Sequence, residues 1–171
     1  PNVLKLLNGR TYTLRGGLSY TQPGTLEAEA SFGRAWLDYT DPGIADTQSW
    51  VADGSVTFTP DETTTLVGSL NTSLAPSTVV SGDTDVGYTL SGTAKYQVNP
   101  WLTLRGSTGA YRTVTLAAGA IDWGYSAGAG LDLASSRHVV WSADYLFTHD
   151  DSSINGRNDT HAVTVGVTVK K

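Results

Sequence analysis

The sequence predicts an all-β chain, folded as an antiparallel up-and-down β-barrel of nine or ten strands. Apolar and polar residues alternate with a period of two through nine segments, most of them longer than the usual strand of about five or six residues. Tight turns alternate with longer polar connections between these segments. No segment has a convincing helical period with capping residues. These observations indicate a row of long hairpins placed side by side.

Each expected strand is bounded by turn or loop residues. The nine strands cover residues 10–20, 26–39, 47–59, 63–75, 85–98, 101–113, 121–133, 139–148 and 159–169. The second begins with LEAEA, which is helix-like in composition but also alternates, and we take the alternation as the stronger signal. Residues 3–7 can supply a tenth strand because Asn8-Gly9 is a strong hairpin turn, although this segment is too short to cross a bilayer alone.

The apolar series is clearest in five strands. It runs through Trp50, Ala52, Gly54, Val56 and Phe58; Val86, Tyr88, Leu90, Gly92, Ala94, Tyr96 and Val98; Ile121, Trp123, Tyr125, Ala127, Ala129, Leu131 and Leu133; Val139, Trp141, Ala143, Tyr145 and Phe147; and Val163, Val165, Val167 and Val169. Several series place rings toward their ends, which is typical of strands that face lipid between two aromatic girdles. Tyr88 and Tyr96 would lie roughly 20 Å apart along the membrane normal.

The connections alternate in length. Tight turns rich in Pro, Gly, Asn, Asp and Ser lie at residues 22–24, 60–62, 99–100 and 135–136. Longer polar connections, TDPGIADTQ, PSTVVSGDT, VTLAAGA and DDSSINGRN, begin at Thr40, Pro76, Val114 and Asp150. We therefore expect a meander with one smooth rim, facing the periplasm, and one rim of long loops, facing outside.

Composition excludes several classes of protein. The net charge of −5 gives no reason to expect nucleic acid, which requires a basic patch. The chain has no Cys, which excludes a disulfide framework and a thiolate metal site, and we expect neither a metal nor a cofactor. No apolar run is long enough for a transmembrane helix, so crossing a membrane would require a closed barrel. Because the chain also lacks Met, we expect a processed protein or a fragment.

The two faces of the strands have different expected environments. The aromatic residues expected to face lipid are Trp36, Trp50, Phe58, Tyr88, Tyr96, Trp123, Tyr125, Trp141, Tyr145 and Phe147. The charged residues expected to line a wet lumen are Arg15, Glu27, Glu29, Asp53, Lys95, Arg105, Asp122, Asp132 and Asp144. A charge facing hydrocarbon would cost about 2–4 kcal/mol. Because this lumen set is acidic, a conducting pore is expected to favour cations.

Two questions stay open at this stage. Alternation alone also fits a soluble sandwich or a lipocalin-like barrel, in which the apolar face would be the protein core. Strand length, low charge and ring placement favour the membrane barrel. Arg34 breaks the pattern, because it shares the parity of Phe32 and Trp36. Either its side chain snorkels toward an interface or a β-bulge shifts the register.

Two segments resemble the β-barrel-porin type 2 family of proteobacterial outer-membrane proteins. They are YQVNPWLTLRGSTGAY (residues 96–111) and VVWSADYLFTHDDS (residues 139–152), which contain a tight Asn-Pro turn, a WLTL strand and a SADY strand entering an acidic loop. The resemblance covers mainly residues 86–171 and implies a barrel in a Gram-negative outer membrane, with a channel or export role. Two features depart from the family pattern. Family barrels are larger, which suggests missing N-terminal strands, and outer-membrane chains usually end in an aromatic residue rather than in Val169-Lys170-Lys171.

One constellation could carry chemistry. His149, Asp150, Asp151 and His161 flank the last long connection, as His and Asp pairs do in outer-membrane proteases. Only their spacing supports a site, so we prefer a solvated polar loop. The segment from Asp151 matches the first half of an EF-hand loop, but Ala162 stands where the bidentate Glu is needed. We therefore expect no enzyme and no bound calcium.

The sequence predicts one outer-membrane β-barrel domain over residues 1–171, or the C-terminal part of a larger barrel. The leading function is a passive pore or an export conduit for hydrophilic solutes or polymer. A non-conducting structural barrel that anchors a partner protein is second, and an outer-membrane hydrolase is third. The expected partners are outer-membrane lipid and lipopolysaccharide, together with other barrel segments or subunits.

Overall fold

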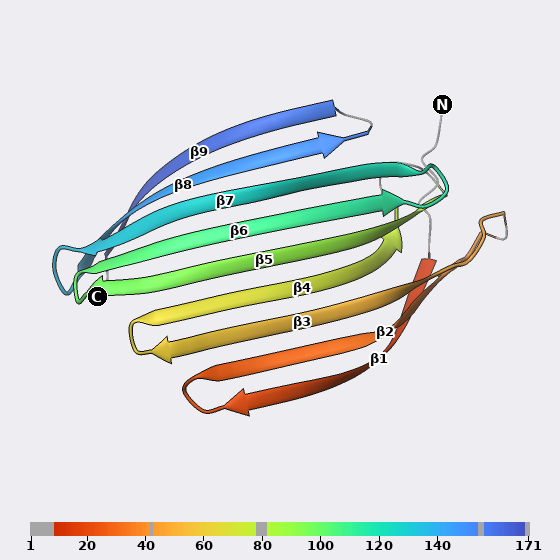
Figure 1. Ribbon diagram of the computed structural model, residues 1–171. Helices are drawn as coiled ribbons and strands as arrows, with labels where there is room; N and C mark the ends of the chain where they lie inside the picture. The colour runs from red at the N-terminus through yellow and green to blue at the C-terminus, as the bar shows by residue number, and fades with distance from the viewer. Residues whose placement is uncertain (1–8, 42, 78–81, 154–155, 170–171) are drawn as a thin grey trace.

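Nine antiparallel strands form a single curved sheet in the order of the chain (Figure 1). The computed structural model describes residues 9–41, 43–77, 82–153 and 156–169. The strands are β1 (Gly9–Gln22), β2 (Leu26–Tyr39), β3 (Thr47–Asp61), β4 (Thr64–Pro76), β5 (Thr84–Asn99), β6 (Leu102–Thr115), β7 (Ala120–Ala134), β8 (Val139–Ser152) and β9 (Gly156–Val169). The predicted all-β meander is confirmed. The candidate tenth strand at residues 3–7 lies outside the described residues.

The two rims differ less than the sequence suggested. The turn rim carries the connections 23–25, 62–63, 100–101 and 135–138, and the loop rim carries 40–46, 77–83, 116–119 and 153–155. The long connections predicted from Val114 and Asp150 are wrong, because β6 to β9 continue into them. Asp150 pairs with Asn158 and Ser152 with Gly156. Near this rim both faces of β8 and β9 are polar, so the alternation ends before the backbone ladder does. Among the described residues, no helix is long and apolar enough to cross a membrane.

The ladder registers assign every strand residue to one of two faces. Residues directly opposite each other share a face, and successive residues alternate between faces. On this basis all nine charged residues predicted for the lumen lie on one face, here called the polar face. All ten aromatic residues predicted to face lipid lie on the other, here called the apolar face. The sheet thus separates the two sets completely.

Arg34 remains on the apolar face. The β2–β3 ladder has no register shift, so a bulge does not explain the exception. Arg34 lies directly opposite Trp50, and its guanidinium carbon is 5.2 Å from the centre of that ring. Phe32 stacks on the same ring at a centroid distance of 5.1 Å. A cation–π contact therefore accommodates the charge beside two aromatic rings.

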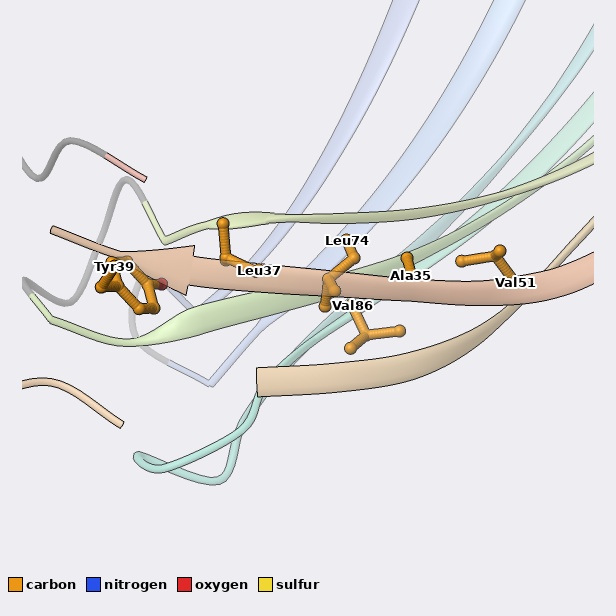
Figure 2. Packing of buried hydrophobic residues seen from close by; sticks show 6 residues of the cluster. All are labelled: Ala35, Leu37, Tyr39, Val51, Leu74 and Val86. Atoms are coloured by element: carbon orange, nitrogen blue, oxygen red, sulfur yellow. The ribbon is translucent and has the colours of Figure 1, made fainter. Parts of the chain in front are cut away.

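Few hydrophobic side chains of the described residues are buried, and they gather near the loop rim (Figure 2). The six are Ala35, Leu37, Tyr39, Val51, Leu74 and Val86. The regular β3–β4 ladder reaches no further toward this rim than the pair Asp53–Asn71. Beyond that pair, the buried residues of β2 and β3 belong to the polar face, whereas Leu74 of β4 and Val86 of β5 belong to the apolar face. Residues of opposite faces therefore pack against each other here. The sheet thus splays between β3 and β4, which the sequence did not predict.

Most of the apolar face has no protein cover among the described residues. Large hydrophobic side chains are exposed along every strand, and all but five of them belong to this face. The five exceptions are Val67, Trp101, Tyr111, Leu116 and Leu146. An exposed apolar surface of this extent marks contact with a partner or a membrane. The described residues therefore do not form the core that a soluble sandwich requires.

The apolar band is staggered along the sheet. Following directly opposite partners from Tyr20, at the turn-rim end of the band in β1, leads across all nine strands to His161 in β9. In β9, however, the turn-rim end of the apolar band is Val169, which lies eight residues beyond His161 along the strand. This is about one residue of stagger per strand, which corresponds to a strand tilt of roughly 35°. Such a tilt is close to that of closed barrels.

Candidate functional site

The polar face is organised around glycines in β7. Arg105 of β6, Gly130 of β7 and Asp144 of β8 lie directly opposite one another across the three strands. A Cβ atom on Gly130 would collide with Asp144 Oδ1. Without that atom, Arg105 reaches over β7, and its Nη2 lies 3.0 Å from Asp144 Oδ1 and 2.9 Å from Asp132 Oδ1. The glycine therefore makes room for an ion pair between strands that are not neighbours.

The same arrangement recurs nearer the loop rim. Tyr111, Gly124 and Asp150 form another row across β6, β7 and β8. The Tyr111 hydroxyl donates to Asp150 Oδ1 at 2.7 Å. A Cβ atom on Gly124 would lie 2.6 Å from Tyr111 Cε1 and 2.7 Å from Asp150 Oδ1. Two rows thus connect β6 and β8 across a glycine strand.

A second ion-paired group joins β1, β3 and β4. Arg15 Nη1 donates to Asp53 Oδ2. The other carboxylate oxygen accepts from Asn71 Nδ2 at 2.5 Å, and Ser31 Oγ lies 3.4 Å from Oδ2. Gly33 lies directly opposite Arg15 on β2, which is the strand between β1 and β3. This group uses the same combination of an opposite-charge pair and a glycine on the intervening strand.

A row of hydroxyl groups crosses the polar face between these charged groups. It consists of Ser19, Ser55, Ser69, Ser91, Ser126, Thr148 and Thr160, with Glu29 and Gly109 completing the row. Ser69 and Ser91 hydroxyls lie 2.7 Å apart, and Ser55 donates to Glu29 Oε1 at 3.0 Å. Hydroxyl groups both donate and accept hydrogen bonds, so this surface suits water and hydrophilic solutes.

The structure adds two acids that the sequence prediction for this face missed. Asp85 lies on the polar face and accepts from the Thr115 hydroxyl at 2.7 Å, and Asp150 lies there beside Tyr111. Asp85 has the parity of Lys95, and Asp150 has the parity of Asp144. This parity is a signal that the sequence contains, but the sequence analysis places Asp150 in a loop.

The predicted histidine and aspartate constellation is divided between the faces. His149 is 3% exposed, lies on the apolar face and pairs through Nδ1 with Asp159. Its ring centre is 5.3 Å from that of Trp123 and 4.9 Å from that of Tyr125. Asp150 points to the opposite face. His149 and Asp150 therefore cannot act together on one substrate.

Sequence reasoning overlooked Asp159 as the partner of His149. The two residues face each other across the β8–β9 hairpin. Pairing of Ser152 with Gly156 fixes the register that places His149 opposite Asp159, whereas the long loop predicted from Asp150 hides this pairing. His161 makes a separate contact, because its Nδ1 lies 2.7 Å from the Tyr145 hydroxyl.

Asp83 connects two segments of the loop rim. Its buried carboxylate accepts hydrogen bonds from the backbone N–H groups of Thr84, Ala117 and Ala118 at 2.7–2.9 Å. Burial opposes ionisation, but these three donors outweigh it and lower the pKa of Asp83 below its ordinary value. The Tyr39 hydroxyl donates to the Asp83 carbonyl at 2.8 Å. In the described part of the chain, no group of three or more His, Cys, Asp or Glu side chains could hold a metal ion.

Comparison with protein families gives a match over nearly the whole chain. The family described as "Putative beta-barrel porin 2" matches residues 2–171. No curated protein matches the chain. The family match covers nearly the whole chain, including the N-terminal strands, which the resemblance seen in the sequence did not cover.

Proposed function

The chain belongs to this β-barrel porin family, and from that premise we propose that it forms a pore or an export conduit for hydrophilic solutes or polymer. The proposed location is the outer membrane of a Gram-negative cell, with outer-membrane lipid and lipopolysaccharide as the partners of the apolar face. The observation that carries the proposal is the complete separation of the lumen and lipid sets onto opposite faces of one staggered sheet.

The apolar face supports contact with lipid. Leu18 of β1 is 82% exposed and Val163 of β9 is 75% exposed, so the band remains uncovered even at the two edge strands. Burying apolar area contributes roughly 25 cal/mol per Å². Lipid covers such a band without requiring a protein partner, and the ring-rich ends of the strands suit its two interfaces.

The polar face supports contact with water. Arg15, Arg105 and their acidic partners keep side-chain exposures between 21% and 38% in their ion pairs. Charged groups on a membrane barrel are inexpensive only where water reaches them. The hydroxyl row gives the rest of this face the same hydrophilic character.

A conduit also needs a closed wall. In the described residues β1 and β9 are the two edges of the sheet, and both run from the loop rim to the turn rim (Figure 1). Direct contact between them would be parallel, and so would contact with a second copy in the same membrane orientation. An antiparallel wall therefore needs an odd number of further strands. We propose that other barrel segments supply them, which makes residues 1–171 part of a larger barrel.

Planar-bilayer recording tests the proposal. The detergent-purified protein should insert and produce discrete conductance steps. A protein that inserts, as shown by heat-modifiable gel mobility, but never conducts would instead support the non-conducting structural barrel. Peptidase or lipase activity without conductance would support the hydrolase.

A further inference from the structure

The polar face carries a surplus of acidic residues. Among the described residues it holds three basic and eight acidic side chains, which are Arg15, Lys95, Arg105, Glu27, Glu29, Asp53, Asp85, Asp122, Asp132, Asp144 and Asp150. This surplus of acids has the same sign as the formal net charge of −5 of the whole chain.

All three basic residues of this face stand in electrically neutral groups. Arg15 pairs with Asp53. Arg105 pairs with both Asp132 and Asp144. Lys95 lies directly opposite Arg105 and lines the same hollow as Arg105 and Asp144. Two bases and two acids thus balance in the second group.

Within the described part of the chain, five acids of the polar face have no basic partner. Asp85, Asp122 and Asp150 lie near the loop rim, whereas Glu27 and Glu29 lie toward the turn rim on β2. The hydrogen bonds that three of them accept come from uncharged hydroxyls, which are Thr115 on Asp85, Tyr111 on Asp150 and Ser55 on Glu29. A neutral donor does not cancel the charge, so each acid keeps its full effect on passing ions.

We propose that the conduit selects cations and that these five acids set the selectivity, while the two neutral groups only hold the wall together. The inference rests on the proposed conduit and assigns its solute class. Fixed charges of one sign in a channel with low-dielectric walls raise the local concentration of ions of the opposite sign. Asp53, Asp132 and Asp144 also lie on the polar face, but they do not contribute to the selectivity because basic side chains neutralise their charges.

The reversal potential in a potassium chloride gradient measures the selectivity. We expect the unmodified protein to be cation-selective, and the Glu27→Gln/Glu29→Gln variant to shift the reversal potential toward zero. The matched control is Arg15→Gln/Asp53→Asn, which removes two charges of opposite sign and should leave the reversal potential unchanged. Asp85→Asn/Asp122→Asn/Asp150→Asn should shift it in the same direction as the glutamate variant.

Each outcome has a distinct meaning. An anion-selective or unselective conductance overturns the inference but leaves the conduit in place. A control variant that shifts the potential as far as the glutamate variant overturns the assignment of residues. Proteins that insert with native gel mobility but never conduct overturn the proposed function itself. Because Glu27 and Glu29 are exposed side chains, their replacement leaves the packing of the sheet intact.

Discussion

The polar and apolar faces are built from alternate residues of the same strands, yet their side chains are ordered in different ways. On the polar face, Arg105 and Tyr111 reach over β7 to carboxylates on β8. On the apolar face, rings lie against neighbouring rings, as in the Trp123–Tyr125 pair at 6.2 Å, while one side stays open. Long polar side chains of the polar face therefore find partners within the sheet, whereas the apolar face depends on whatever surrounds the sheet.

Two adjacent residues of β5 give the largest expected contrast between the faces. Ala94→Arg places a charge on the apolar face near the middle of the band and should destabilise the protein by about 2–4 kcal/mol. Lys95→Glu changes a charge on the polar face and should be tolerated, since Arg105 lies directly opposite. The temperature at which gel mobility changes to that of the unfolded chain measures both. Equal stability, or damage confined to the Lys95 variant, would mean that the two faces are assigned the wrong way round.

Glycine replacements test the contacts across β7. Gly130→Ala forces a Cβ atom toward Asp144 and should cost about 1–3 kcal/mol, as overpacking usually does. The matched control is Gly106→Ala on the apolar face, where the nearest atom to the new Cβ is Ala94 Cβ at 3.9 Å. Thermal melting of both variants in detergent checks the difference. If both variants lose the same stability, the ion pair between Arg105 and Asp144 across β7 does not depend on the glycine at position 130.

Strong acid should loosen the loop rim by protonating Asp83. The pKa of Asp83 is lowered in the folded state, so its stabilisation is complete above the ordinary value of 3.8 and is lost as pH falls through the lower folded value. Hydrogen exchange at Ala117 and Ala118 should therefore accelerate in strong acid. Asp83→Asn should show the faster exchange already at neutral pH. Exchange that is insensitive to both changes would contradict the role of the carboxylate.

The smallest expected effect concerns Arg34, a charge beside the rings of Phe32 and Trp50 on the apolar face. Arg34→Gln removes the cation–π contact with Trp50 and should cost about 0.5–1 kcal/mol. Arg137→Gln, at an exposed position in the turn between β7 and β8, is the control and should change the stability less. A stabilising effect of Arg34→Gln would contradict this role and show that the charge of Arg34 destabilises the folded protein.

The sequence predicted what depends on period-two alternation. All nine strands and both sets of face residues follow from it, because the pleat places alternate side chains on opposite faces. It did not predict the ends of β8 and β9, since backbone pairing continues where both faces are polar. Contacts such as Arg105–Asp144 need knowledge of which three residues stand in one row. The splay between β3 and β4 depends on packing near the loop rim, which no local pattern encodes.

The contact between the apolar face and lipid is the central claim, and intrinsic fluorescence tests it without any substitution. Four of the five tryptophans, Trp36, Trp50, Trp123 and Trp141, lie on the apolar face, and Trp101 lies in a turn. In bilayers of phospholipid with brominated acyl chains, most of the tryptophan emission should be quenched, while aqueous iodide should quench little. Strong quenching by iodide with little effect of the brominated lipid would show that the apolar face lies in water rather than in lipid.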